Sequence, residues 1–168
     1  VLDTSRLKYV LGKYFNVNNT NIHSYVIGEH GDSEVVTWSN GRVGGEDFDM
    51  YAKQLDLEWD NDIKKVIEED VKNAAYEIIS RKKATYFAVA LAVNRIVEAI
   101  FRNENSILTV DSLFEGQYGI EDMYLAIPTI VNRGGAQEII QISLADDELN
   151  RLKESATILK KHLNECNV

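Results

Sequence analysis

The stretch ILTVDSLFEGQYGIEDMYLAIPTIV, residues 107–131, decides the fold class of this chain. It holds two apolar runs with a glycine-containing turn between them, which is typical of two neighbouring strands. The expected strands in this region are 107–114, 123–131 and 138–143, and the expected turns are 115–119 and 132–135. Because links this short join strands that run in opposite directions, we expect antiparallel pairing.

Helical patterns surround these strands. Apolar residues recur with helical spacing over 2–15, from the start signal at 60–62 to residue 79, and from the acidic run 146–148 towards the C-terminus. Residues 84–101 are apolar almost all round, so we expect a helix buried on most sides, joined to the preceding helix by a kink at 80–83. The inner face expected for the last helix consists of Leu149, Leu152, Ala156, Leu159 and Leu163.

Two shorter strands are predicted nearer the N-terminus, at 23–28 and 35–39, followed by a glycine-rich loop at 40–46. With helices set apart from an antiparallel sheet, the predicted fold class is α+β, and we expect residues 1–168 to form a single domain. The sequence lacks both the βαβ alternation and the Gly-x-Gly-x-x-Gly fingerprint of a dinucleotide-binding sheet.

Composition and charge exclude several classes of function. The chain carries 18 Lys and Arg against 27 Asp and Glu, and its net charge of −9 argues against a nucleic-acid or anionic-membrane surface. The single cysteine, Cys166, rules out an intrachain disulfide and fits a reducing compartment. No apolar run has membrane-spanning length, and no signal peptide is visible. Because the chain opens without a methionine and already in a helical pattern, we expect a piece of a longer protein.

The chemistry is concentrated in Ile27-Gly28-Glu29-His30-Gly31-Asp32-Ser33. A histidine stands between two glycines, which allow a tight turn or close approach to a ligand, and two carboxylates flank it. Since the unperturbed pKa of histidine lies near physiological pH, we interpret His30 as a positioned proton-transfer residue at the end of a strand.

Asp3 and Arg6 lie three residues apart on the first predicted helix and therefore share one face. One interpretation is a solvated ion pair of little energetic consequence. In the other, the two residues have separate roles. Asp3 accepts a hydrogen bond from His30 and stabilises its imidazolium, and Arg6 binds a substrate carboxylate with its planar fork.

These motifs together resemble the L-lactate dehydrogenase family. VLDTSR at 1–6 is followed by GEHGDS at 28–33, and the similarity continues in KATY at 83–86, GQYG at 116–119 and IPTIVNR at 127–133. The resemblance implies the C-terminal, substrate-binding domain of a longer enzyme of the lactate and malate dehydrogenase superfamily. The N-terminal half, absent from this chain, would be a Rossmann domain that binds NAD.

The resemblance also implies roles for individual residues. His30 would exchange the proton as pyruvate and L-lactate interconvert, with Asp3 as its orienting partner and Arg6 as the anchor of the substrate carboxylate. Thr85 would lie beside the substrate side chain and Val89 against the nicotinamide ring, although plain helix packing also accounts for both positions. General acid–base catalysis of this kind contributes about 10²–10⁴-fold to the rate.

In bacterial members of the family, fructose 1,6-bisphosphate binds between subunits, and the corresponding basic positions here are Lys8 and His23. Lys8 stands where arginine is common, so we expect phosphate binding to be weaker or differently tuned; the alternative is two ordinary solvated side chains. The resemblance further implies a cytoplasmic homotetramer that serves glycolysis and pyruvate fermentation. No metal site is expected, because the three histidines show no ligand spacing.

Two alternatives stay open. The full-length enzyme could be a broader L-2-hydroxyacid dehydrogenase or a malate dehydrogenase, because much of the discrimination in this superfamily lies on a mobile loop of the other half. The 168 residues could instead serve as a non-catalytic oligomerisation module, and as an isolated fragment we expect them to be inactive.

Overall fold

The computed structural model describes residues 1–83 and 85–166, apart from the side chains of residues 75, 79 and 82. The α-helices are α1 (Leu2–Tyr14), α2 (Phe48–Gln54), α3 (Asn61–Lys82), α4 (Phe87–Arg102) and α5 (Asp146–Glu165), and the 3-10 helices are η1 (Asn19–Asn21), η2 (Trp38–Asn40) and η3 (Gln117–Gly119). The strands are β1 (Ile22–His23), β2 (Val26–Ile27), β3 (Val35–Val36), β4 (Arg42–Val43), β5 (Glu46–Asp47), β6 (Ser106–Glu115), β7 (Glu121–Asn132) and β8 (Gly135–Ile139).

The described strands form three separate antiparallel sheets, ordered β1-β4-β5, β2-β3 and β6-β7-β8. The long hairpin β6-β7 and its turn confirm the strand prediction for 107–131, and the α+β class is confirmed. The third strand was predicted too late in the chain: β8 covers 135–139 instead of 138–143, because the turn is only residues 133–134 and Gly135 already pairs with Asn132.

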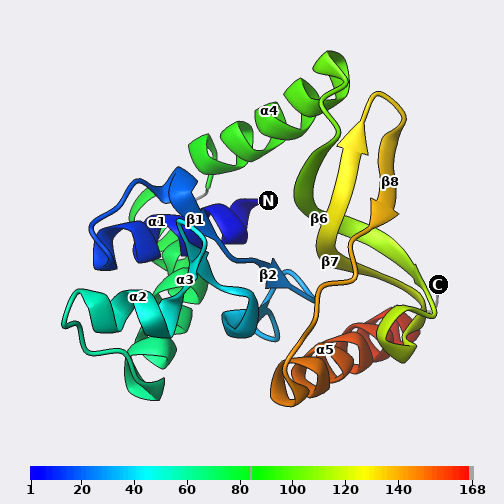
Figure 1. The fold of residues 1–168 in the computed structure, drawn as a ribbon. Helices are drawn as coiled ribbons and strands as arrows, with labels where there is room; N and C mark the ends of the chain where they lie inside the picture. Colours follow the sequence, from blue (N-terminus) through cyan, green and yellow to red (C-terminus); the bar gives the residue numbers. More distant parts are fainter. Residues whose placement is uncertain (84, 167–168) are drawn as a thin grey trace.

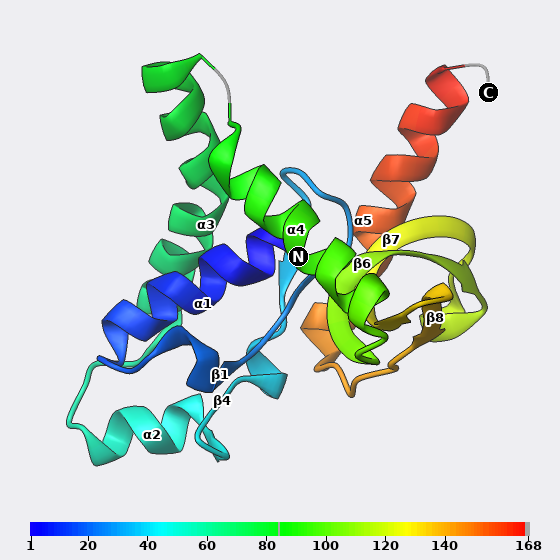
Figure 2. The same cartoon turned by 90° about the horizontal axis from the view of Figure 1, so that it is seen from above.

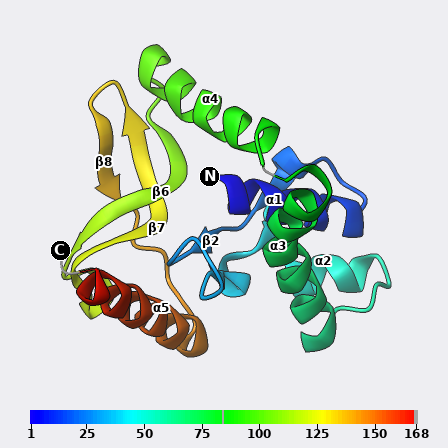
Figure 3. The same ribbon diagram turned by 180° about the vertical axis from the view of Figure 1, so that it is seen from behind.

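Two hydrophobic cores lie on either side of β2 (Figure 1). The first joins α1, α2 and α3 around aromatic side chains such as Phe15, Phe48 and Trp59. The second joins the face of β6-β7 that holds Phe114 and Leu125 to α5. From behind, the helical group and the sheet with α5 stand apart, and β2 crosses between them (Figure 3).

Strand β2 joins the two cores covalently and through hydrogen bonds. Gly28, directly after β2, exchanges two backbone hydrogen bonds of 2.9 Å with Ala126 of β7. The segment that follows β2 contains His30. The candidate site therefore lies at the boundary between the two cores.

The segments around β2 depart from the predicted strands. Residues 23–28 do not form one strand, because β1 pairs with β4 whereas β2 pairs with β3, and Thr37 bonds to the Tyr25 backbone between them. The second predicted strand, 35–39, ends at Val36 and continues as η2. The predicted loop at 40–46 contains β4 and the start of β5, a hairpin that turns at Gly44-Gly45.

Helix α2 was not predicted, although Asp47 caps it by accepting a hydrogen bond from Met50 N at 2.7 Å. The start signal of α3 is confirmed, because Asp60 Oδ1 accepts from the backbone N–H groups of Asp62 and Ile63. The predicted kink at 80–83 is a break between helices: α3 runs to Lys82, Lys83 has φ +67°, and α4 begins at Phe87. Residue 84, the first residue of the predicted helix 84–101, lies outside the described residues.

The prediction that 84–101 is buried on most sides is wrong for the described chain. Only Ala99 of α4 is buried, while Leu91 and Phe101 are 71% and 76% exposed. Helix α4 lies along the upper edge of the molecule and packs mainly against β7 (Figures 1 and 2). The apolar residues of α4 are typical of a helix whose side chains are buried on several sides. In the described chain, only one side of α4 packs against other elements.

Helix α5 packs its first half against the sheet. Leu152 and Ala156 are buried as predicted, and Leu149 and Leu159 are partly buried. Leu163 is 45% exposed, contrary to the prediction, because the last turns of α5 extend past the sheet (Figure 2). In the described part of the chain, no helix is both long and apolar enough to cross a membrane.

Candidate active site

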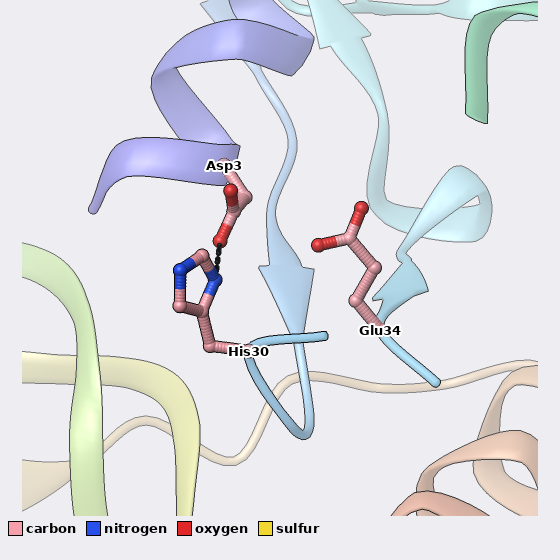
Figure 4. A group of neighbouring side chains, drawn as sticks. All are labelled: Asp3, His30 and Glu34. Atoms are coloured by element: carbon pink, nitrogen blue, oxygen red, sulfur yellow. Dashed lines mark ion pairs between the residues drawn. The ribbon is translucent and has the colours of Figure 1, made fainter. Parts of the chain in front are cut away.

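His30 lies in the loop after β2 and points its ring towards the first turn of α1 (Figure 4). Its Nδ1 atom lies 2.5 Å from Oδ2 of Asp3. The other carboxylate oxygen of Asp3 accepts a hydrogen bond from Nη1 of Arg6 at 2.9 Å. The structure thus brings together the three residues that the sequence singled out, with Asp3 in the middle.

The helix explains this arrangement. Asp3 and Arg6 lie one turn apart on α1, and both side chains are largely buried, at 16% and 13% exposure. The His30 side chain is 64% exposed. A charged pair that is held by the helix therefore supports an imidazole that stays accessible to a ligand.

The pKa values of the pair shift in the directions expected for an acid and a histidine in contact. The hydrogen bond to Asp3 raises the pKa of His30, against the opposing effect of partial burial, and the charges of Asp3 and Glu34 raise it further. Burial favours a higher pKa for Asp3, but the hydrogen bond and charge of His30, together with Arg6, outweigh it and lower that pKa. The pair therefore favours imidazolium and carboxylate.

Two neighbouring cavities meet at His30. The first, of about 200 Å³, has mostly charged residues in its lining, which consists of Asp3, Arg6, His30, Gly31, Asp32, Glu34, Val71, Lys72 and Tyr76. The second, of about 320 Å³, is bounded on the side of α4 by Val89, Ala92, Val93 and Ile96. Since His30 and Asp3 line both, the imidazole lies between a charged cavity and a mostly apolar one.

Two helices hold the loop that carries His30. From α3, Lys72 Nζ donates to the backbone oxygen of Asp32 at 3.0 Å, and Tyr76 Oη donates to its carboxylate at 3.3 Å. From α5, Ser155 Oγ accepts from the backbone N–H of Glu29 at 2.8 Å and lies 3.0 Å from Ser33 Oγ. The loop is thereby attached to both halves of the fold.

Glu34 belongs to this site but was missed in the sequence. It stands directly before β3 and is only 4% exposed. Burial, followed by the charge of Asp3, raises the pKa of Glu34 to about 7, although Lys72, His30 and Arg6 act in the other direction. The available signal was an acidic residue immediately before the apolar pair Val35-Val36.

Asp3, His30 and Glu34 are also residue types that bind metal ions, and one ligand atom of each lies within 4.8 Å of the others (Figure 4). However, Nδ1 of His30 is already engaged by Asp3. The arrangement is therefore a histidine paired with Asp3, with Glu34 to one side of the pair, which suits proton transfer.

The remaining predicted residues are spread around this centre. Val89 lines the apolar cavity at His30, whereas Thr85 lies between α3 and α4 and lines neither of the two cavities. Lys8 lines a separate cavity of about 320 Å³ with Arg95, and burial lowers its pKa. His23 is exposed on β1 and does not line the cavity that holds Lys8.

Comparison with known proteins gives consistent matches over nearly the whole chain. Residues 1–167 match the family described as lactate/malate dehydrogenase, alpha/beta C-terminal domain. An L-lactate dehydrogenase of Clostridium perfringens (strain SM101 / Type A) is 55% identical over 163 residues, covering 97% of this chain and 51% of that protein. L-lactate dehydrogenase 1 of Clostridium acetobutylicum is 53% identical over 164 residues, covering 98% and 52%.

Solved structures show the same similarity. A lactate dehydrogenase from a Medee basin deep-sea metagenome library superposes with a TM-score of 0.94 at 42% identity, over 99% of this chain and 53% of the other. The ligand-bound minor L-lactate dehydrogenase of Enterococcus mundtii gives 0.92 at 40% identity, over 98% and 52%. The chain spans about half the length of the curated relatives it matches.

Proposed function

The chain belongs to the lactate/malate dehydrogenase C-terminal domain family, and from this we propose that it is the substrate domain of an NAD-dependent L-lactate dehydrogenase that interconverts pyruvate and L-lactate. The other half of the full-length protein would supply the Rossmann domain that binds most of NAD. The observation that carries the proposal is the placement of Asp3, Arg6 and His30 around one small cavity.

His30 exchanges the proton. Because its Nδ1 is engaged by Asp3, the other ring nitrogen, Nε2, is the one left to exchange a proton with the substrate. In the reduction of pyruvate, the imidazolium donates this proton to the ketone oxygen; in the oxidation of L-lactate, the neutral ring accepts the hydroxyl proton. Asp3 fixes the ring and stabilises its charged form, as the raised pKa of His30 and the lowered pKa of Asp3 indicate.

Arg6 holds the substrate carboxylate. Its Nη1 bonds to Asp3, which orients the guanidinium and leaves other N–H groups for a carboxylate in the same cavity. Lys72 adds positive charge to the cavity wall. A cavity of about 200 Å³ suits a small 2-oxo acid. Thr85 is proposed to approach the substrate side chain once the complete site is assembled.

The residues of the second cavity fit the nicotinamide end of the cofactor. The wall that α4 presents is built from aliphatic side chains, among them Val89 and Ile96, and a planar ring can lie against such a wall. When bound, NAD supplies the hydride acceptor and NADH the hydride donor. The protein's contribution is to exclude water with this wall and to hold His30 beside the reacting carbon.

The test is an assay of the complete protein with NADH and pyruvate, oxaloacetate or 2-oxoisocaproate. We expect pyruvate to have the highest kcat/KM. A preference for oxaloacetate would identify a malate dehydrogenase, and a preference for 2-oxoisocaproate a broader L-2-hydroxyacid dehydrogenase. The isolated 168 residues are expected to show no lactate-dependent formation of NADH. Turnover by this fragment would contradict the proposal that the other half of the protein binds most of NAD.

We further propose a cytoplasmic homotetramer that serves pyruvate fermentation. The exposed apolar side chains of α4, including Leu91 and Phe101, support burial against another part of the protein or another subunit. Light scattering on the complete protein tests the assembly, and a strictly monomeric active species would contradict it. If the complete protein assembles but does not turn over any 2-oxo acid, a purely structural role for this domain would be favoured.

Regulation by fructose 1,6-bisphosphate through Lys8 and His23 remains a proposal. Lys8 lines a cavity together with Arg95, which supports an anion site on that face. His23 lies outside this cavity, so a shared site would require a contribution from another subunit. Titration of the complete protein with the bisphosphate is expected to lower the KM for pyruvate, and no effect on KM or assembly would exclude it.

A further inference from the structure

Glu34 is a buried acid at the edge of the cavity that holds His30. The residue is only 4% exposed, and its Oε1 atom has no hydrogen-bond partner in the described part of the chain. A buried carboxylate without a partner is costly, so such a group is seldom present without a reason. None of the roles proposed above uses it.

The position of Glu34 relative to His30 is well suited to an electrostatic effect. Asp3 approaches the imidazole from α1, and Glu34 approaches it from the start of β3 (Figure 4). One ligand atom from each of the three side chains lies within 4.8 Å of the others. Charges at such separations interact strongly when they are partly shielded from water.

Several charged or titratable groups face Glu34. They are Asp3 and Arg6 on α1, His30 in the loop, Lys72 and Tyr76 on α3, and Arg151 on α5, which donates to the backbone oxygen of Glu34 at 3.5 Å. Burial and the charge of Asp3 disfavour the carboxylate more than the cations favour it, so the pKa of Glu34 rises to about 7. Glu34 therefore changes its charge in the pH range in which a histidine does.

We propose that Glu34 is a positioning residue for His30: its carboxylate lies close to both Asp3 and the imidazole and stabilises the imidazolium. This inference rests on the proposed function, in which protonated His30 delivers a proton to a 2-oxo acid. Glu34 acts through His30. Because each charge alters the ionisation of the other, the two residues titrate as a coupled pair.

The experiment measures kcat/KM for pyruvate reduction by the complete protein as a function of pH. Glu34→Gln keeps the size of the side chain and removes its charge. We expect the alkaline midpoint of the profile to move to lower pH by about half a unit to one unit, which lowers kcat/KM about three- to tenfold above the midpoint. On the acid side of the midpoint, where Glu34 is itself protonated, the variant should approach the wild type.

Two further variants separate this effect from a general loss of structure. Glu69→Gln makes the same change in net charge at an exposed position of α3, and its midpoint should match that of the wild type. Glu34→Asp restores a carboxylate, so its midpoint should return towards the wild-type value. An unchanged midpoint in Glu34→Gln, or an equal loss of activity at every pH, overturns the inference.

A direct reading of Glu34 distinguishes this inference from the proposed function. If the wild type reduces no 2-oxo acid, the proposed function is wrong. The infrared spectrum then shows independently whether the carboxyl group of Glu34 titrates near neutral pH. The C=O band of a protonated carboxylic acid should be present at pH 6, decrease by pH 8, and be missing from Glu34→Gln. If the band is absent from the wild type, Glu34 does not titrate in this range, and the inference fails. If Glu34→Gln does not fold, the infrared titration of the wild type decides, and absence of the titrating band overturns the inference.

Discussion

Gly28 lies directly against the hydroxyl group of Ser155, and a Cβ atom at residue 28 would be only 2.8 Å from Ser155 Oγ. The same oxygen accepts the hydrogen bond from the backbone N–H of Glu29. Helix α5 therefore holds the chain at the residue before His30, and this contact requires a glycine. The backbone adds a second reason, because Gly28 has φ +91°, which L side chains rarely adopt.

Gly28→Ala is expected to destabilise the fold and to displace the His30 loop. The strained φ and the contact with Ser155 together should cost about 2–4 kcal/mol in the free energy of unfolding. Gly44→Ala is the matched control, because Gly44 also has a positive φ, +59°, but its Cβ would meet nothing within 4 Å. It should cost only about 1 kcal/mol. Urea denaturation measures both, and equal losses would show that contact with α5 is unimportant.

Asp3→Asn is expected to lower the pKa of His30 and to reduce turnover. The amide keeps the shape of the carboxylate but removes the charge that favours the imidazolium. We expect kcat/KM for pyruvate to fall about 10²-fold or more in the complete protein, with the alkaline limb of the pH profile moved to lower pH. If Asp3→Asn had the pH profile of the wild type, Asp3 would not determine the pKa of His30.

The same pair makes stability depend on pH. The folded pKa of His30 lies above 6.5, so its contribution is fully present below 6.5 and is lost as the pH rises through the raised value. The folded pKa of Asp3 lies below 3.8, so its contribution is present above 3.8 and is lost as the pH falls through the lowered value. The difference in Tm between wild type and Asp3→Asn should therefore be largest between about pH 4 and 6.5 and smaller at alkaline pH.

Arg6→Lys is expected to raise the KM for pyruvate about 10²-fold, with a smaller effect on kcat. Lysine keeps the positive charge but lacks the planar fork that can bind Asp3 and a substrate carboxylate at the same time. Arg102→Lys on the exposed end of α4 serves as the control and should leave both constants unchanged. Steady-state kinetics give the answer, and a wild-type KM for Arg6→Lys would mean that another group anchors the carboxylate.

The parts of the fold and site that could be predicted are those whose cause is local. The helix that carries Asp3 and Arg6 follows from residue spacing, and the hairpin β6-β7 follows from two apolar runs around a short turn. The meeting of Asp3 with His30 is different, because nothing in the residues between them specifies their distance. It was one of two interpretations of Asp3 and Arg6, the resemblance favoured it, and the Asp3–His30 ion pair of 2.5 Å agrees with it.

Apart from α2, which begins at a local cap, the features that were missed depend on partners distant in the sequence. Strands β1 and β2 are two residues each, because the pairing partner changes between them, at Tyr25, which bonds to Thr37, and not because of a break in apolarity. The exposure of α4 could not be predicted from its apolar residues. Apolar residues favour burial, but they do not show which part of a protein buries them. Glu34 looked like any acidic residue until the folded chain placed it beside Asp3.

Glu34→Gln is expected to stabilise the protein at alkaline pH. Because the pKa of Glu34 is raised from 4.5 to about 7, the unfolded chain releases this proton first, and wild-type stability falls as the pH rises between these values. The loss amounts to about 3 kcal/mol once the pH exceeds 7, and to less than about 1 kcal/mol at pH 5.

Glutamine carries no proton to lose, so the gain in the free energy of unfolding for Glu34→Gln should grow from pH 5 to pH 8. Urea denaturation at the two pH values measures this gain. Glu69→Gln, at its exposed position, should gain nothing at either pH. A gain that is the same at both pH values would mean that Glu34 does not titrate between them. A stability gain together with the altered pH profile of turnover would mean that the buried acid is kept for the chemistry of His30, at a cost to the fold.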